Sequence, residues 1–176
     1  MNLRRNQISD INILEKVDFK ELKDLNLCDN KITDINILEK VNFKELKILN
    51  LSHNKISDIN ILKDVRFEKL ESLSLIKNEI TDINVLENAN FKNLKILFLG
   101  FNKITDINVL EKVNFDKLEN LDLSVNNISD ITVFDRVKFK LKDLNIGDNK
   151  FNKQDISSII TKLREKIDRV SCIMNN

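Results

Sequence analysis

Two polar side chains recur along this chain at a fixed spacing, and both types can bind ligands. Asparagine returns every 24 residues, with a last step of 23, at Asn6, Asn30, Asn54, Asn78, Asn102, Asn126 and Asn149. Aspartate keeps the step of 24 at Asp10, Asp34, Asp58, Asp82, Asp106 and Asp130. Stacked carboxylates could bind calcium, but calcium-binding β-helix repeats are glycine-rich, and this chain has two glycines. We therefore expect no metal site, and we expect each aspartate to accept backbone N–H bonds before a short helix.

Residues that could carry catalysis are scarce. The single histidine, His53, precedes Asn54 in a variable position of the repeat. No Cys/His or Ser/His/Asp arrangement is visible, and neither a phosphate-binding loop nor a dinucleotide fingerprint is present. We expect no enzymatic activity and no cofactor, with His53 acting as a surface contact.

Composition bounds the class of partner. Lysine and arginine number 29 against 28 acidic residues, for a net charge of +1, which does not favour nucleic-acid binding. No apolar run approaches the roughly 20 residues of a membrane span, and no signal peptide is visible at the N-terminus. Cys28 and Cys172 are too distant to pair, because six strand steps of about 4.8 Å would separate them. Unpaired thiols favour a cytoplasmic location; an extracellular fragment is the alternative.

Each repeat has two halves that must position these ladders. In Leu22–Glu45, the segment LKDLNL alternates Leu25 and Leu27 with polar neighbours, which predicts a strand. The segment NILEKVNF has apolar residues at helical spacing but has room for only one or two turns, α or 3-10. Asn36 followed by Glu39 predicts a helix N-cap with a capping-box partner.

Stacking such units would bury an apolar stripe that one unit alone cannot bury. The phrase LKDLNLCDNKI, Leu22–Ile32, resembles the leucine-rich repeat pattern L-x-x-L-x-L-x-x-N-x-L, and the extension N-x-I-S/T-D-I resembles bacterial internalins and phosphatase-regulator repeats. The phrase recurs from Leu46, Leu70, Leu94, Leu118 and Leu141. The resemblance implies a curved α/β solenoid, a horseshoe with a parallel sheet on its concave face and short α or 3-10 turns on its convex face. It also implies that the asparagines turn inward and bond backbone groups.

The two ends of the array differ. We interpret residues 1–150 as a half repeat followed by about six repeats, and residues 151–176 as a C-terminal cap within a single domain. The cap is predicted to hold an amphipathic helix over Asp155–Ile167 and a last strand, with Asn175 in the ladder position. The N-terminal strand edge would lie open, so a homodimer through this edge is possible.

The residues that vary between repeats indicate a function. Counting Leu22 as position 1, alternation turns positions 3, 5 and 7 outward, and position 8 comes next at the strand end. Apolar residues gather in the middle of this map at Ile48, Ile76, Ile96, Phe98, Phe101 and Val125, with His53 beside them. Gly100 is expected to leave room for the rings or for a partner. The sequence thus predicts non-enzymatic protein–protein recognition through the concave face, centred on Phe98. The alternative is a self-associating array that uses its open N-terminal edge.

Overall fold

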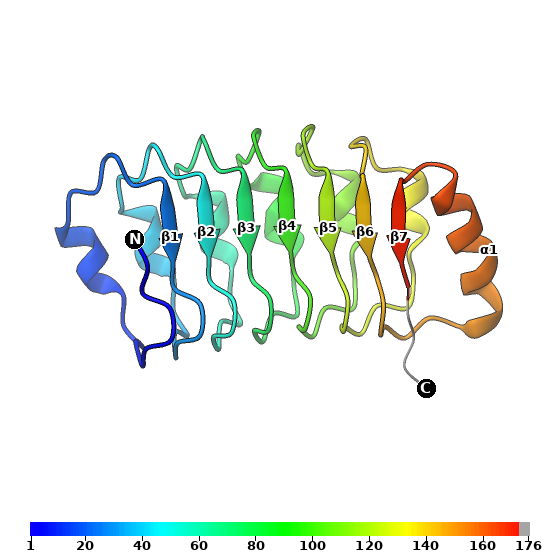
Figure 1. Cartoon of the computed structure of the whole chain (residues 1–176), viewed down its shortest axis with the longest axis horizontal. Coiled ribbons are helices and arrows are strands. Elements are labelled where there is room, and N and C mark those ends of the chain that lie inside the picture. The colour runs from blue at the N-terminus through cyan, green and yellow to red at the C-terminus, as the bar shows by residue number, and fades with distance from the viewer. Residues whose placement is uncertain (173–176) are drawn as a thin grey trace.

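Seven short strands stack in sequence order into one parallel sheet, as Figure 1 shows for this computed structural model, which describes residues 1–172. The strands are β1 Asp24–Asn26, β2 Ile48–Asn50, β3 Ser72–Ser74, β4 Ile96–Phe98, β5 Asn120–Asp122, β6 Asp143–Asn145 and β7 Arg169–Ser171. Each strand pairs with the next in the same register, so that Leu25, Leu49 and Leu73 are aligned across β1, β2 and β3. The expected position of Asn175 lies outside the described residues.

Short helices cover the back of the sheet (Figure 1). Six are 3-10 helices: η1 Asn12–Lys16, η2 Asn36–Glu39, η3 Asn60–Lys63, η4 Asn84–Asn88, η5 Asn108–Glu111 and η6 Thr132–Asp135. The seventh is the α-helix α1, Lys153–Arg164. Runs of 5 residues or fewer suit the tighter 3-10 geometry. The prediction of a leucine-rich repeat solenoid with a parallel sheet and short helical turns is confirmed.

The core lies between the sheet and the helices. Leu25 and Leu27 are fully buried, as are their counterparts in the repeats of β2 to β6. Some of the recurring phenylalanines stack on their neighbours, with ring centroids 6.3 Å apart between Phe43 and Phe67 and 6.2 Å apart between Phe91 and Phe115. Continuous burial along the stack supplies the apolar area that one repeat lacks.

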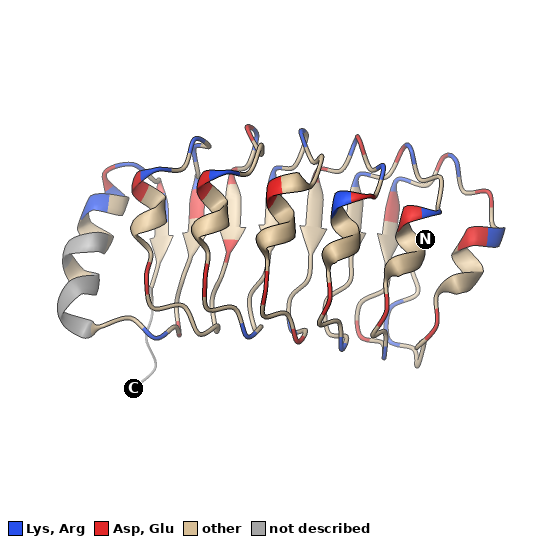
Figure 2. Ribbon diagram, turned by 180° about the vertical axis from the view of Figure 1, so that it is seen from behind, with Lys and Arg blue, Asp and Glu red and all other residues tan. Residues whose placement is uncertain are grey.

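The capping-box prediction for Asn36 is wrong. The N-cap of η2 is Ile35, and no side chain caps this helix. Instead, the Asp34 carboxylate accepts a hydrogen bond from the Asn36 N–H at 2.8 Å. The aspartate thus bonds the first residue of the helix from two residues before it. All six recurring aspartates make this bond. Figure 2 shows acidic segments leading into the helices in succession.

The two ends behave differently. Helix α1 ends at Arg164, three residues before the predicted end at Ile167. After it, the N–H groups of Lys166 and Ile167 both donate to the Leu163 carbonyl, at 3.0 and 2.9 Å. Its residues Ile160 and Leu163 are buried, and β7 extends the sheet beyond β6. At the other end Asn2 makes a single parallel bridge with Asn26. Ile13 is 62% exposed there.

Candidate functional site

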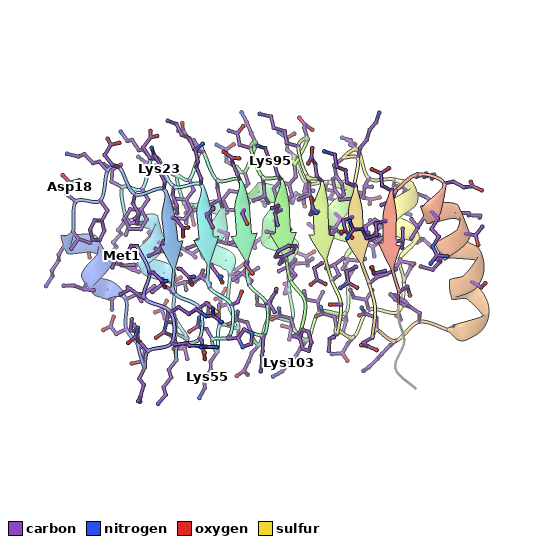
Figure 3. All side chains as sticks on the ribbon, in the orientation of Figure 1. Met1, Asp18, Lys23, Lys55, Lys95 and Lys103 are labelled. Atoms are coloured by element: carbon purple, nitrogen blue, oxygen red, sulfur yellow. The ribbon has the colours of Figure 1, made fainter. Side chains whose placement is uncertain are left out.

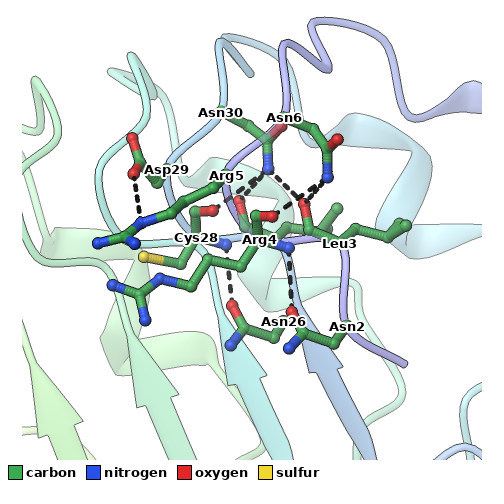
Figure 4. Close-up of polar contacts among 10 residues, drawn as sticks. Asn2, Leu3, Arg4, Arg5, Asn6, Asn26, Cys28, Asp29 and Asn30 are labelled. Atoms are coloured by element: carbon green, nitrogen blue, oxygen red, sulfur yellow. Dashed lines mark hydrogen bonds and ion pairs between the residues drawn. The ribbon is translucent and has the colours of Figure 1, made fainter.

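The asparagine ladder is bonded to the backbone of two repeats at once. The Asn54 side chain accepts a hydrogen bond from the Ile32 N–H at 3.0 Å and donates to the carbonyls of Leu27 and Leu51 at 3.1 and 3.0 Å. Asn30, Asn78, Asn102, Asn126 and Asn149 repeat this pattern. Figure 4 shows the first rung, where Asn30 bonds the Leu3 and Cys28 carbonyls. The ladder therefore joins each turn to the turn before it.

The residue before each asparagine adopts a left-handed backbone. These residues are Arg5, Asp29, His53, Lys77, Phe101, Val125 and Asp148, with φ between 52° and 61°. This sharp turn comes three residues after the strand ends, and the asparagine that follows it is directed inward. Glycine and asparagine adopt such angles at little cost, whereas a β-branched residue such as Val125 is an outlier.

Position 5 of most repeats also serves the turn. The side-chain oxygens of Asn26, Asn50, Asp122 and Asn145 each accept the backbone N–H two residues later, at 2.9 to 3.2 Å. These bonds are Asx turns, which fix the chain as it leaves the strand. Phe98 occupies the same position in β4 and has no oxygen to offer.

The apolar residues of β4 and its turn reach the surface of the sheet. Ile96 and Phe98 are half-buried on either side of the buried Leu97. Phe101 is 51% exposed, so it is not a core residue. Val125 is the counterpart of Phe101 in the next repeat and is half-buried. We call Ile76, Ile96, Phe98, Phe101 and Val125 the central patch.

Position 7 does not face freely outward as predicted. Ser52 and Ser124 are buried there, because the strands end at position 5 and the next repeat covers the residues after it. The Ser52 hydroxyl lies 2.6 Å from the Ser74 hydroxyl at position 5 of the next repeat. The same offset places Ile76 beside Phe98.

Gly100 does not leave space for the rings or for a partner, and this expectation is also wrong. A Cβ added at Gly100 would lie 2.9 Å from the Asp122 Oδ2 atom and 3.1 Å from the Ser124 hydroxyl. The space is therefore filled by the side chains of the following repeat. A side chain at this position would require the Asp122 carboxylate and the Ser124 hydroxyl to shift.

Two residues expected near the patch lie outside it. Ile48 is 43% exposed, but Ser72 of β3 stands between it and Ile96 in the sheet register. His53 is exposed in the turn after β2, and Lys77 holds the equivalent turn position between His53 and Phe101.

A hollow that sequence reasoning missed adjoins Phe98 on the sheet face. It measures about 240 Å³ and is lined by Phe98, Asn120, Leu121, Asp122, Asp143, Asn145, Arg169 and Ser171. Asp122 lies directly opposite Phe98 in the pairing of β4 with β5. One signal could have revealed it: Asp122 is an aspartate at a position where three other repeats have asparagine. A larger hollow of about 690 Å³ between the first and second full repeats is lined by charges of both signs.

Charged side chains crowd both ends of the strands (Figure 3), with Lys23 and Lys95 at one end and Lys55 and Lys103 at the other. The Glu71 carboxylate lies 2.8 Å from Lys95 and 3.1 Å from Lys47. Hydrogen bonds from these two lysines lower the pKa of Glu71 below its usual 4.5. Such exposed pairs contribute little stability.

Two other kinds of feature are absent from residues 1–172. No helix in this range is long and apolar enough to cross a membrane. Within the same range, no group of three or more His, Cys, Asp or Glu residues could hold a metal ion. Cys28 and Cys172 are both free thiols.

Comparison with known structures shows the same architecture elsewhere. An internalin from Listeria monocytogenes has a TM-score of 0.75 and 29% identity, and the match covers 96% of this chain and 46% of that one. A second internalin from that species has a TM-score of 0.68 and 23% identity, covering 99% of this chain and 79% of that one. A leucine-rich repeat protein from Leptospira interrogans has a TM-score of 0.62 and 22% identity, covering 98% and 48%. The last two show likeness of fold alone.

The family assignment comes from the sequence itself. No curated protein matches the chain. A family model described as leucine-rich repeats in two copies matches residues 20–64, 68–112 and 92–136, which together span more than half of the chain. The chain therefore belongs to the leucine-rich repeat family.

Proposed function

We propose that this chain is a non-enzymatic recognition module that binds a partner protein through its sheet face, with the central patch as the contact. The observation that carries the proposal is that three neighbouring residues have side chains poorly suited to their local backbone or exposure. Phe98 replaces a residue that would bond the turn, Phe101 exposes an aromatic ring, and Val125 is β-branched in a left-handed turn. Each residue is poorly suited to the fold where it stands, and all three reach one surface. Partner contact gives a reason for keeping them there.

Position 98 offers a test in which folding and binding separate. Phe98→Asn installs the residue that Asn26, Asn50 and Asn145 already use at this position. The new amide should gain a bond to the Gly100 N–H of about 1 kcal/mol. This gain offsets the lost burial of a ring that is only half-buried, so Tm should change by less than about 4 °C.

In contrast to Tm, which should hardly change, binding of the partner should be lost in Phe98→Asn. Affinity capture with immobilised wild-type chain and Phe98→Asn, side by side, should show a partner that the variant loses. Ile13→Asn is the matched control, because it removes an exposed apolar side chain far from the patch. If Phe98→Asn retains the partner, the patch is not the contact. If it unfolds like Leu97→Ala, expected to cost about 2–5 kcal/mol, the ring belongs to the core.

The second candidate is self-association through the N-terminal edge. Ile13 is 62% exposed, whereas its counterpart Ile37 is 7% exposed because the preceding repeat covers it. Under this proposal, Leu3→Asp should convert a dimer to a monomer in multi-angle light scattering. A wild-type chain that remains monomeric at high concentration would exclude it.

A further inference from the structure

The hollow beside Phe98 combines an aromatic wall with a carboxylate. Phe98 and Asp122 are direct partners in the register of β4 and β5, so their backbones lie about 4.8 Å apart. Asn120 shares the face of Asp122 on β5, and Asp143 and Asn145 of β6 line the far side. A group entering the hollow would therefore meet the ring and the carboxylate together.

The fold does not require the negative charge of Asp122. Its Oδ1 atom accepts the Ser124 N–H at 2.9 Å, and the neutral amides of Asn26 and Asn50 make the same bond at 3.0 Å. Asparagine would therefore hold this turn equally well. Among the described residues, no hydrogen bond or ion pair uses the Asp122 Oδ2 atom. The Oδ2 atom, which lies against Gly100, thus carries a charge that no described protein group pairs.

Neighbouring charges do not neutralise this site. Among the described residues that line the hollow, only Arg169 is basic, and its Nη1 atom lies 3.4 Å from the Asp143 carboxylate. Arg169 thus partly neutralises Asp143 and leaves Asp122 uncompensated. The lining residues thus carry two carboxylates against one guanidinium, a net charge of −1. A carboxylate next to an aromatic face favours a cation.

We propose that this hollow receives a positively charged side chain of the partner protein, and specifically an arginine. A guanidinium group can stack on the Phe98 ring and bond the Asp122 carboxylate with its N–H donors, whereas an ammonium group is less suited to stacking. The inference rests on the proposed function and names the chemistry that the partner must present.

The test uses two small probes of nearly the same shape. N-acetyl-arginine methylamide and its neutral counterpart N-acetyl-citrulline methylamide are titrated into the ¹⁵N-labelled chain and followed by NMR. The arginine probe should shift the amides of Phe98, Asn120 and Asp122 in a saturable manner, with at least about tenfold tighter binding than citrulline. Raising the salt concentration should weaken the arginine probe alone.

Matched variants locate the effect. Asp122→Asn keeps the Asx turn and removes the charge, so the arginine probe should fall to the affinity of citrulline. Asp24→Asn, which removes a carboxylate from the sheet face at β1, should leave the affinity unchanged. Equal binding of the two probes, or an unaffected Asp122→Asn, would overturn the inference. Loss of the captured partner in Phe98→Asn would then still support the proposed function, so the two failures are distinguishable.

Discussion

At the residue scale, one residue in the turn after each strand has a left-handed backbone conformation. Residues of several different types occupy this position in the repeats. Val125 has a φ of 52°, where its branched Cβ crowds the backbone. Phe101, at 56°, carries an exposed ring in the same conformation. Of the seven described residues in this conformation, only Val125 and Phe101 are apolar, so these two point to a second demand on the surface.

This strain predicts a stabilising substitution. Val125→Asn should raise the free energy of unfolding by about 1 kcal/mol, and Tm by about 2–4 °C, because asparagine tolerates the left-handed backbone. Lys77→Asn is the matched control, since it makes the same change at the same turn position without a β-branched starting residue. Thermal unfolding followed by circular dichroism would measure both. Equal gains in the two variants would show that β-branching stores no strain at Val125.

At the element scale, the asparagine side chains bond one turn to the next, in addition to the hydrogen bonds between strands. The Asn78 side chain accepts the Ile56 N–H and donates to the carbonyls of Leu51 and Leu75, at 3.0 to 3.1 Å. Asn78→Ala should therefore lower stability by about 2–4 kcal/mol, because buried backbone groups lose their partners. Asn6→Ala, at the exposed end of the ladder, should cost less than about 0.5 kcal/mol. Urea unfolding of the two variants would test this, and similar losses would contradict it.

The segments that lead into the 3-10 helices predict a dependence on pH. Hydrogen bonds from the backbone N–H and hydroxyl of Thr132 lower the pKa of Asp130 below its usual 3.8. A carboxylate with a lowered pKa stabilises the fold above the pKa of the unfolded chain, and this contribution is lost as the pH falls through the lower, folded value. Stability should therefore decline below about pH 4, and Asp130→Asn should decline less steeply. Thermal unfolding at pH 6, 4 and 2.5 would show whether the two curves converge in acid.

Much of the framework was predictable because each apolar position recurs every 24 residues. Repetition fixes the strand order, the buried leucines and the inward asparagines. Position 7 was mispredicted because alternation assumes that the strand continues, whereas β1–β7 have three residues each and the next repeat covers the residues beyond the strand. The role that we propose for Asp122 could not be seen in the sequence for a related reason. It depends on Phe98, which lies opposite Asp122 on the neighbouring strand β4. It also depends on the turn bond to the Ser124 N–H, which an asparagine could make equally well.

At the scale of the whole molecule, a stack of repeats is a one-dimensional array in which each unit is held by its neighbours. The interior strands have a repeat on both sides. The first strand, β1, has only a half repeat beyond it, where Leu3 is half-buried and Ile13 is largely exposed. Local opening should therefore begin at this end.

Two equivalent hydrogen bonds allow a direct measurement of this gradient. The Leu27 N–H bonds the Asn50 carbonyl and the Leu75 N–H bonds the Phe98 carbonyl, both at 2.8 Å, and both leucines are fully buried. Only their places in the array differ. In native-state hydrogen exchange followed by NMR, the Leu27 amide should exchange at least about tenfold faster than the Leu75 amide. Equal rates would mean that the array opens as one cooperative unit.

A variant at the opposite end completes the test. Leu163 of α1 is 3% exposed, so Leu163→Ala should loosen the C-terminal end. The Ile146 N–H, which bonds the Ser171 carbonyl at 2.9 Å, should then exchange faster, while the Leu27 amide keeps its wild-type rate. Acceleration of both amides would show that the two ends are coupled through the stack. The central patch, which includes β4 and the turns after β3, β4 and β5, would then respond to changes at either end. If the two ends are independent, a change at one end would not reach the patch.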